Sequence, residues 1–254
     1  HKILSAVENF LPMERCAEFT VEAGRPDTIT ADKLETLKRH GIHRISINPQ
    51  SMEDQVLRDM GRSHTAGEIV EAMALAEEHF GGLVNMDLIA GLPADSREGF
   101  GRTLERVLAM EPANITVHTL ALKKGSRLTE EGGELCTAGT VEAMLELASR
   151  RLRRAGYVPY YLYRQKYMSG SFENVGWARP GAVCAYNIVM MEELQSVLSL
   201  GAGGITKLVD PGNRKIVRLG NPKYAKEYLE GWDKVAAAKR TAAGFQAELA
   251  ARGK

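Results

Sequence analysis

The chain has 254 residues, 44% of them hydrophobic and 26% charged, which is enough for one large globular domain or two small ones. With 33 basic and 32 acidic residues the formal net charge is +1, so the overall basic surface of a nucleic-acid-binding protein is excluded. No apolar run reaches the roughly 20 residues that span a bilayer, and the three widely spaced cysteines fit neither a disulfide framework nor a CxxC metal site, so a cytoplasmic protein is expected.

Short apolar runs alternate with helix-like segments through the first two thirds of the chain. Thr30 is a suitable N-cap and Gly41 a suitable C-cap for one of these helices. Strands are expected at 16–21, 42–47, 83–89 and 114–122, and helices at 31–40, 66–80 and 97–110. This alternation predicts an α/β fold of parallel β/α units, arranged either as a closed or partly closed barrel or as an open doubly wound sheet.

The composition changes after residue 162. Residues 157–167 are rich in tyrosines and cations, and 170–181 contain too many glycines and prolines for one regular element. A helix near 190–198, a strand at 205–209 and a helical tail from residue 235 onward are expected after them. We therefore predict a β/α domain over 1–162 and a smaller appended α+β domain over 163–254.

Polar or small residues stand at the ends of the predicted strands. Glu22 follows the first apolar run, Gln50 follows the second, Asp87 interrupts the third, and His118 and Ala121 follow the fourth. Because ligands of β/α folds bind at the carboxyl ends of the strands, these residues predict one pocket. Asp87 is the most informative, since an unpaired carboxylate within an apolar run costs several kcal/mol.

Each of these residues, taken alone, also has a purely structural interpretation. Asp87 suits a strand-end cap of the following loop, and Glu22 suits a solvated loop acid. Arg62 is commonly a surface guanidinium, and His64 and His118 are more often structural histidines than ligands.

Several sequence blocks, taken together and in order, carry a family resemblance. They are 21–26 (VEAGRP), 41–51 (GIHRISINPQS), 60–64 (MGRSH) and 87–93 (DLIAGLP). This ordered set resembles the oxygen-independent coproporphyrinogen oxidases of the radical S-adenosylmethionine (SAM) superfamily. The blocks 161–166 (YLYRQK) and 173–176 (ENVG) look most like the HemZ-type coproporphyrinogen dehydrogenase branch.

The resemblance implies a partial (β/α) barrel of the radical SAM type, with the first strands missing, and the appended domain. Members of the family use a [4Fe-4S] cluster held by a CxxxCxxC motif to cleave SAM to a 5'-deoxyadenosyl radical. That radical starts the decarboxylation of two propionates of coproporphyrinogen III to vinyl groups, which gives protoporphyrinogen IX in haem biosynthesis. The implied partners are this porphyrinogen or haem, together with an electron donor such as flavodoxin or ferredoxin.

The resemblance also assigns roles to individual residues. Arg62 suits the methionyl carboxylate of SAM, because a guanidinium offers two parallel hydrogen bonds. Acidic and amide side chains can accept hydrogen bonds from ribose hydroxyls or from the methionyl ammonium. By position, the SAM contacts fall on Glu22, Gln50, Arg62 and Asp87, and the residues flanking the adenosine are Ala121 and Ile205.

The substrate is expected to meet the tyrosine- and cation-rich stretch 157–179. Arg164 and Arg179 are the predicted propionate contacts, since each guanidinium can bind a carboxylate through two hydrogen bonds. The alternative is that the tyrosines pack a junction between domains while the cations remain solvated.

One feature departs from the family pattern. The chain contains no CxxxCxxC, and its cysteines are Cys16, Cys136 and Cys184. We expect a fragment whose first strands lie upstream, with a natural truncation as the alternative, and an isolated chain that holds no [4Fe-4S] cluster and has no activity. Because the motif is missing, a haem carrier without decarboxylase activity is the alternative function. A radical enzyme that acts on haem itself is a third candidate.

Overall fold

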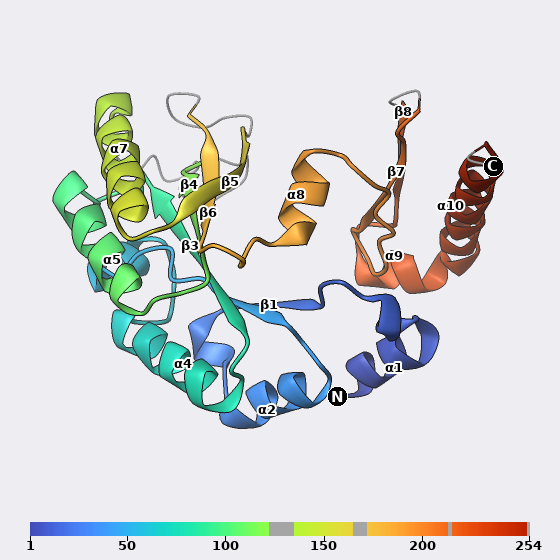
Figure 1. Cartoon of the computed structure of the whole chain (residues 1–254), viewed down its shortest axis with the longest axis horizontal. Coiled ribbons are helices and arrows are strands. Elements are labelled where there is room, and N and C mark those ends of the chain that lie inside the picture. Colours follow the sequence, from blue (N-terminus) through green and yellow to red (C-terminus); the bar gives the residue numbers. More distant parts are fainter. Residues whose placement is uncertain (122–134, 165–171, 213–214, 253–254) are drawn as a thin grey trace. The chain divides into compact units, whose positions relative to one another are not determined.

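In a computed structural model the chain forms two compact units, His1–Cys184 and Ala185–Lys254. The structure describes residues 1–121, 135–164, 172–212 and 215–252, which Figure 1 draws as ribbons. None of the helices in these ranges combines the length and the apolar character that crossing a bilayer requires.

The first unit contains a six-stranded mixed sheet with the strand order β1-β2-β3-β4-β6-β5. Its parallel strands are β1 (Thr20–Gly24), β2 (Arg44–Ile47), β3 (Leu83–Ala90) and β4 (Asn114–Thr119). The two remaining strands are β5 (Val158–Tyr163) and β6 (Asn174–Ala178), and β6 runs antiparallel to both β4 and β5. The carboxyl ends of β1 to β4 therefore lie at one edge of the sheet, and β5 ends at the same edge.

Helices lie along one side of this sheet (Figure 1). They are α1 (Lys2–Phe10), α2 (Ala31–Arg39), α3 (Asp54–Asp59), α4 (Ala66–His79), α5 (Arg97–Ala109) and α7 (Ala138–Arg154). Four of them, α2, α4, α5 and α7, begin at a hydroxyl side chain that accepts a hydrogen bond from a backbone N–H of the first turn, which is the ordinary way to satisfy those donors. These N-caps are Thr30, Thr65, Ser96 and Thr137.

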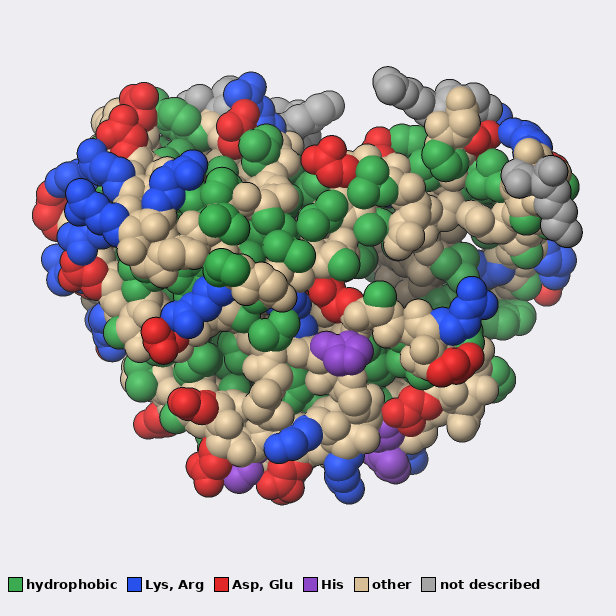
Figure 2. Space-filling view, viewed as in Figure 1, with side chains coloured by type: hydrophobic (Ala, Val, Ile, Leu, Met, Phe, Trp, Pro, Cys, Tyr) green, Lys and Arg blue, Asp and Glu red, His purple; other side chains and the backbone are tan. Residues whose placement is uncertain are grey.

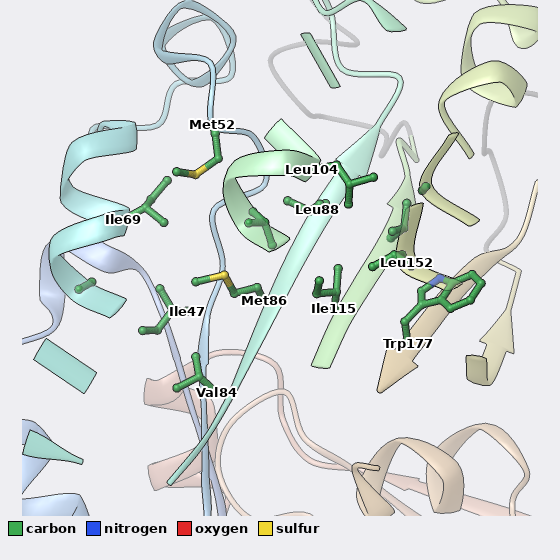
Figure 3. Close-up of a cluster of buried hydrophobic side chains, with 14 of the residues drawn as sticks. Ile47, Met52, Ile69, Val84, Met86, Leu88, Leu104, Ile115, Leu152 and Trp177 are labelled. Atoms are coloured by element: carbon green, nitrogen blue, oxygen red, sulfur yellow. The ribbon is translucent and has the colours of Figure 1, made fainter. Parts of the chain in front are cut away.

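The core lies between the sheet and these helices. Strand residues alternate between the two faces, so every second side chain points to the helices. Those side chains are apolar and almost fully buried, and Figure 3 shows several of them packed against helix residues. They include Ile45, Ile47, Val84, Met86, Leu88, Ile115 and Val117. The alternate residues form the opposite face of the sheet, and these are mostly polar.

The second unit is built on an antiparallel hairpin, β7 (Ile205–Asp210) and β8 (Lys215–Gly220), with three helices. The helices are α8 (Ala185–Met191), α9 (Ala225–Glu230) and α10 (Trp232–Arg252). Lys239 of α10 donates to the Thr206 hydroxyl on β7 at 2.9 Å, which ties the helical tail to the hairpin.

The predicted α/β fold with a partial barrel and a smaller C-terminal unit is confirmed, and the main differences lie around β6 and α8. Residues 174–178 form a strand between β4 and β5, although glycines and prolines in 170–181 favoured a loop. The contacts therefore divide the chain after Cys184, whereas the sequence placed the boundary at residue 162. The helix expected at 190–198 is wrong, since α8 ends at Met191 and Glu193 adopts a φ of 52°, outside the helical region.

Basic and acidic side chains are interspersed over the helices of the first unit on the face seen in Figure 2. This distribution agrees with the near balance of charges in the sequence.

Candidate functional site

The side of the sheet opposite the helices, termed the polar face, carries two of the predicted SAM contacts, Glu22 and Asp87. It consists of Thr20, Glu22, Arg44, Ser46, Asn85, Asp87, Asn114, Thr116 and His118 on β1 to β4. Such a row of polar side chains on parallel strands is unusual for a face that only packs a core. The polar face is therefore the candidate site, and its two ends differ in chemistry.

Glu22 lies within β1 rather than after it, because the strand spans Thr20–Gly24 instead of the predicted 16–21. Its Oε2 accepts a hydrogen bond of 2.6 Å from the Ser46 hydroxyl on β2. The Ser46 oxygen in turn accepts from the backbone N–H of Gly24 at 3.3 Å. These bonds fix one carboxylate oxygen of Glu22 on the polar face.

Gln50 follows β2 and continues its pairing with β3. Its N–H donates to the Asp87 carbonyl at 2.9 Å, and its own carbonyl accepts from Ile89 at 3.0 Å. The residue is 7% exposed and has a φ of 65°, a left-handed backbone that glutamine rarely adopts. Strained backbone that flanking hydrogen bonds hold in place is common at ligand sites.

Arg62 lies in the loop between α3 and α4, and this loop lies beside the segments that follow β1 and β2. The adjacent Ser63 hydroxyl accepts from Arg25 at 2.7 Å, and the buried His64 ring lies 3.5 Å from the Pro49 carbonyl. The Arg62 guanidinium forms no hydrogen bond or ion pair with the described residues, so it is available to an anion.

Asp87 and His118 are neighbours on the polar face. The Oδ2 of Asp87 lies 3.6 Å from Nε2 of His118, and the two side chains are 27% and 23% exposed. The Nδ1 of the same ring lies 3.2 Å from the hydroxyl of Tyr163 on β5. A carboxylate, an imidazole and a phenol thus form a chain across the sheet.

The second tyrosine of the YLY sequence lies beside the first. The rings of Tyr161 and Tyr163 are stacked with centroids 6.2 Å apart and planes 7° apart. The Tyr161 hydroxyl lies 3.2 Å from the Thr116 hydroxyl, and burial raises the pKa of Tyr161 so that it stays protonated. Residues 165–171, which include the rest of the YLYRQK block, lie outside the described residues.

The ENVG block makes room for these tyrosines. A Cβ on Gly176 would lie 1.8 Å from the Tyr161 ring, so only glycine lets that ring cross β6. Asn174 is 1% exposed, and its Oδ1 accepts from the backbone N–H of Thr119 at 2.7 Å. The two sequence blocks that suggested the HemZ-type branch therefore build one wall of the polar face.

The amino-terminal end of the polar face holds a buried arginine that the sequence interpretation missed. Arg44 is 1% exposed and donates through Nη1 to the side-chain oxygens of Asn85, at 2.7 Å, and of Asn114. Its Nη2 donates to the backbone carbonyls of 182–183 at 3.0 Å, and its Nε lies 3.7 Å from Glu18. The sequence signal that could have revealed this buried residue was an arginine inside the predicted strand 42–47. The contacts of Arg44 hold the sheet together.

The two predicted propionate contacts lie at opposite ends of the sheet. Arg164 follows β5 at the carboxyl ends of the parallel strands, where it pairs with Glu173 at 3.0 Å and is 65% exposed. Arg179 follows β6 at the amino-terminal ends, where it donates to Glu111 at 2.9 Å and to the Tyr157 hydroxyl at 3.3 Å. Of the two, only Arg164 lies on the edge to which Asp87 and His118 belong.

The predicted adenosine neighbours are divided between the two units. Ala121 lies two residues after the end of β4. The preceding Leu120 N–H donates to the Ala90 carbonyl at 3.0 Å, so Ala121 lies at the carboxyl ends of the strands. Ile205 begins β7 in the second unit and is 57% exposed.

A separate cavity of about 810 Å³ lies beside the first turns of α5 and α7. Burial raises the pKa of its Asp95 carboxyl to about 6, and burial also raises the pKa of the nearby Cys136 thiol. None of the predicted site residues lines this cavity.

The cysteines do not fit a [4Fe-4S] cluster. Cys136 donates to the Leu92 carbonyl at 3.3 Å, whereas Cys16 and Cys184 both lie near Glu18. Within the described ranges no group of three or more His, Cys, Asp or Glu side chains could hold a metal ion. Since such clusters are held by closely grouped thiolates, this chain does not supply the ligands.

We therefore expect the chain to retain no cluster after anaerobic reconstitution with iron and sulfide. The measurement is the iron and acid-labile sulfide content after desalting, with a cysteine-free variant of the chain as the control. Near-stoichiometric iron and sulfide on the chain, absent from the cysteine-free control, would contradict this prediction.

Comparison with known proteins agrees with this geometry. Residues 11–107, which contain β1 to β3 and the predicted contacts Glu22, Gln50, Arg62 and Asp87, match the family model described as the radical SAM superfamily. This part of the chain is therefore similar to the radical SAM superfamily.

The chain is 43% identical over 229 residues to the oxygen-independent coproporphyrinogen-III oxidase-like protein HemZ of Bacillus subtilis, covering 89% of this chain and 46% of the relative. It is 27% identical over 229 residues to the heme chaperone HemW of Escherichia coli, covering 90% of this chain and 57% of that protein. The chain thus spans about half the length of the curated relatives it matches.

The fold also matches a solved structure, the coproporphyrinogen III oxidase HemN of Escherichia coli, which is described as a radical SAM enzyme. The TM-score is 0.71 with 21% sequence identity, and the match covers 92% of this chain and 52% of that one. At this identity the match supports the fold alone.

Proposed function

We propose that this chain is the SAM-binding and substrate-facing part of a radical SAM enzyme that decarboxylates propionates of coproporphyrinogen III to vinyl groups, giving protoporphyrinogen IX. The observation that supports the proposal is the polar face, which carries Glu22 and Asp87 beside a wall built by the YLY and ENVG sequences. The 43% identity to HemZ supports the choice within the superfamily.

The polar face and the loops beside it fit SAM chemically. Arg62 has a guanidinium without a partner among the described residues, which suits a carboxylate. Glu22, Gln50 and Asp87 offer side-chain oxygens at the same edge of the sheet, which suit hydroxyl and ammonium donors. Bound SAM supplies the carbon radical in this class of chemistry. We also propose Ala121, at the carboxyl ends of the strands, as a neighbour of the adenosine, while the role of Ile205 in the second unit stays a prediction from the resemblance.

For the substrate, we propose Arg164 as a propionate contact, since it is exposed at the carboxyl edge and its partner Glu173 can exchange for another carboxylate. Arg179 remains a second proposed contact, but it first has to leave Glu111 and Tyr157. A flavodoxin or ferredoxin as electron donor, and a cytoplasmic location, complete the proposal.

The proposed activity belongs to a longer protein, because the cysteines of this chain do not fit the cluster. The test starts from the coding sequence upstream of His1. We expect an in-frame CxxxCxxC, and we expect the protein expressed from it to convert coproporphyrinogen III and SAM anaerobically to protoporphyrinogen IX and 5'-deoxyadenosine. Cleavage of SAM without any porphyrinogen product would contradict the substrate assignment.

A haem carrier is the second candidate function, because the heme chaperone HemW is similar over 90% of this chain. The same preparation distinguishes the two. Stoichiometric haem binding, together with no conversion of coproporphyrinogen III, would favour the carrier over the decarboxylase.

A further inference from the structure

Each ring nitrogen of His118 on the polar face lies near a polar side chain. Its Nε2 lies 3.6 Å from the Asp87 carboxylate, and its Nδ1 lies 3.2 Å from the Tyr163 hydroxyl. A histidine that merely fills space in a sheet needs neither partner. The proposed SAM contacts include Asp87 but leave His118 and Tyr163 without a role.

The fold brings these three side chains together from separate strands. In the β3–β4 register Asp87 is opposite Thr116 and Ile89 is opposite His118, so the imidazole is one residue pair further along the same face. Tyr163 comes from β5 and reaches His118 across β6.

Strand β6, which lies between β4 and β5, also bears on a ligand site beside His118 and Tyr163. Asn174 lies at the start of β6, opposite Tyr163, and its buried Nδ2 has no hydrogen-bond partner among the described residues. An unpartnered buried amide is costly, and it is typical of a site that completes its hydrogen bonds with a ligand or water. The Asp87 and His118 side chains stay partly exposed, so a ligand can reach them.

We propose that His118, held by Tyr163, is a positioning residue that sets the charge beside Asp87 and so makes binding of an S-adenosyl ligand depend on pH. With a neutral ring, the Tyr163 hydroxyl donates to Nδ1 and the Nε2–H faces Asp87, which keeps its full negative charge. With a protonated ring, an imidazolium cation opposes that charge and competes with the hydrogen-bond donors and cationic groups of the ligand. Binding therefore weakens as the pH falls.

Among the three kinds of side chain in this chain of contacts, histidine is the kind whose charge ordinarily changes between about pH 5 and 8. The groups facing it are the Asp87 carboxylate from β3 and the Tyr163 and Tyr161 phenols from β5, while the described residues of β6 opposite β4 contribute no titratable side chain. Carboxylates titrate near about pH 4 and phenols near about pH 10, outside this range.

The test measures the Kd of S-adenosylhomocysteine by calorimetry with the full chain. This inference rests on the proposed SAM site. We expect affinity to fall by about tenfold between about pH 7.5 and pH 5.5, as expected for a unit charge appearing within about 4 Å of the carboxylate. In His118→Gln, which cannot acquire a charge, we expect a change of less than about twofold over the same range.

Two tyrosine variants form a matched pair. Tyr163→Phe removes the hydroxyl on His118, and we expect it to weaken binding about threefold at every pH because the ring is no longer held. Tyr161→Phe removes the neighbouring hydroxyl, which contacts Thr116 instead, and we expect it to keep the pH profile of the wild type. Near-ultraviolet circular dichroism confirms that each variant is folded.

The possible outcomes distinguish a failure of the role proposed for His118 from a failure of the proposed SAM site. A flat profile in the wild type, or the same pH dependence in His118→Gln as in the wild type, overturns the role of His118 while the SAM site stands. If the wild type fails to bind S-adenosylhomocysteine at any pH, the proposed site itself is wrong, and this inference falls with it.

Discussion

Replacing Arg44 with leucine is expected to lower the free energy of unfolding of the first unit by about 3–5 kcal/mol, as is usual when one partner is removed from a buried charged network. Arg44 is almost completely buried. Leucine leaves the side-chain oxygens of Asn85 and Asn114, two backbone carbonyls and the Glu18 carboxylate without this donor. The two buried asparagine oxygens then lose a donor that water cannot replace, whereas Glu18 keeps its contacts with Thr20 and Cys184.

Urea unfolding followed by tryptophan fluorescence measures this effect. The chain has two tryptophans, and Trp177 is buried against the sheet of the first unit whereas Trp232 belongs to the second. A Trp232→Phe background therefore makes the signal specific for the first unit. Arg44→Lys, which keeps the charge but loses the two-pronged geometry, should unfold between the wild type and Arg44→Leu.

Arg151→Leu is the matched control. Arg151 forms a 2.9 Å ion pair with Glu105, but both side chains are about half exposed. Such surface pairs contribute about 0–1 kcal/mol, so this variant should unfold close to the wild type. If Arg44→Leu unfolds at the same urea concentration as this control, the buried network does not stabilise the sheet.

The sequence was sufficient to predict most of the parallel sheet and the convergence of three site residues. Apolar runs bounded by capped helices are a local pattern, and parallel order follows from the alternation of strands and helices. Once four strands are parallel, residues at their carboxyl ends share an edge whatever the details of packing. Glu22, Gln50 and Asp87 could be grouped for that reason.

The features that the sequence did not predict depend on contacts between distant residues. β6 was taken for a loop because Gly176 counts as a breaker, yet this glycine is needed where the Tyr161 ring crosses the strand. The partners of Arg44 include Ala182, 138 positions along the chain, so nothing local distinguishes it from a surface arginine. The role proposed for His118 depends on its contact with Tyr163, which is 45 positions away. Tyr163 belongs to a strand whose neighbours in the sheet the sequence does not specify.

Removing the Asp87 carboxylate or the Arg62 guanidinium is expected to weaken binding of S-adenosylhomocysteine by about 2–5 kcal/mol, the usual cost of leaving a charged partner unpaired in a desolvated site. At 1.4 kcal/mol per tenfold change in Kd, this is a loss of about 30-fold to several thousandfold. Calorimetric titration of Asp87→Ala and Arg62→Ala measures it. Asp59→Ala and Arg58→Ala on helix α3 are the controls, and they should bind the ligand like the wild type. They remove the same kinds of group at positions where, among the described residues, each side chain contacts only Gln55.

Stability should change far less than binding in these variants. Asp87 has a single 3.6 Å contact with His118 and remains 27% exposed, while Arg62 has no side-chain partner in the described part of the chain. Urea unfolding should therefore place both within about 1 kcal/mol of the wild type, as for other surface charges. A large loss of binding with preserved stability identifies a ligand site on the polar face. Wild-type affinity in both variants would remove these two residues from the cofactor pocket, and equal losses of binding and stability would mean that the two charges support the sheet instead.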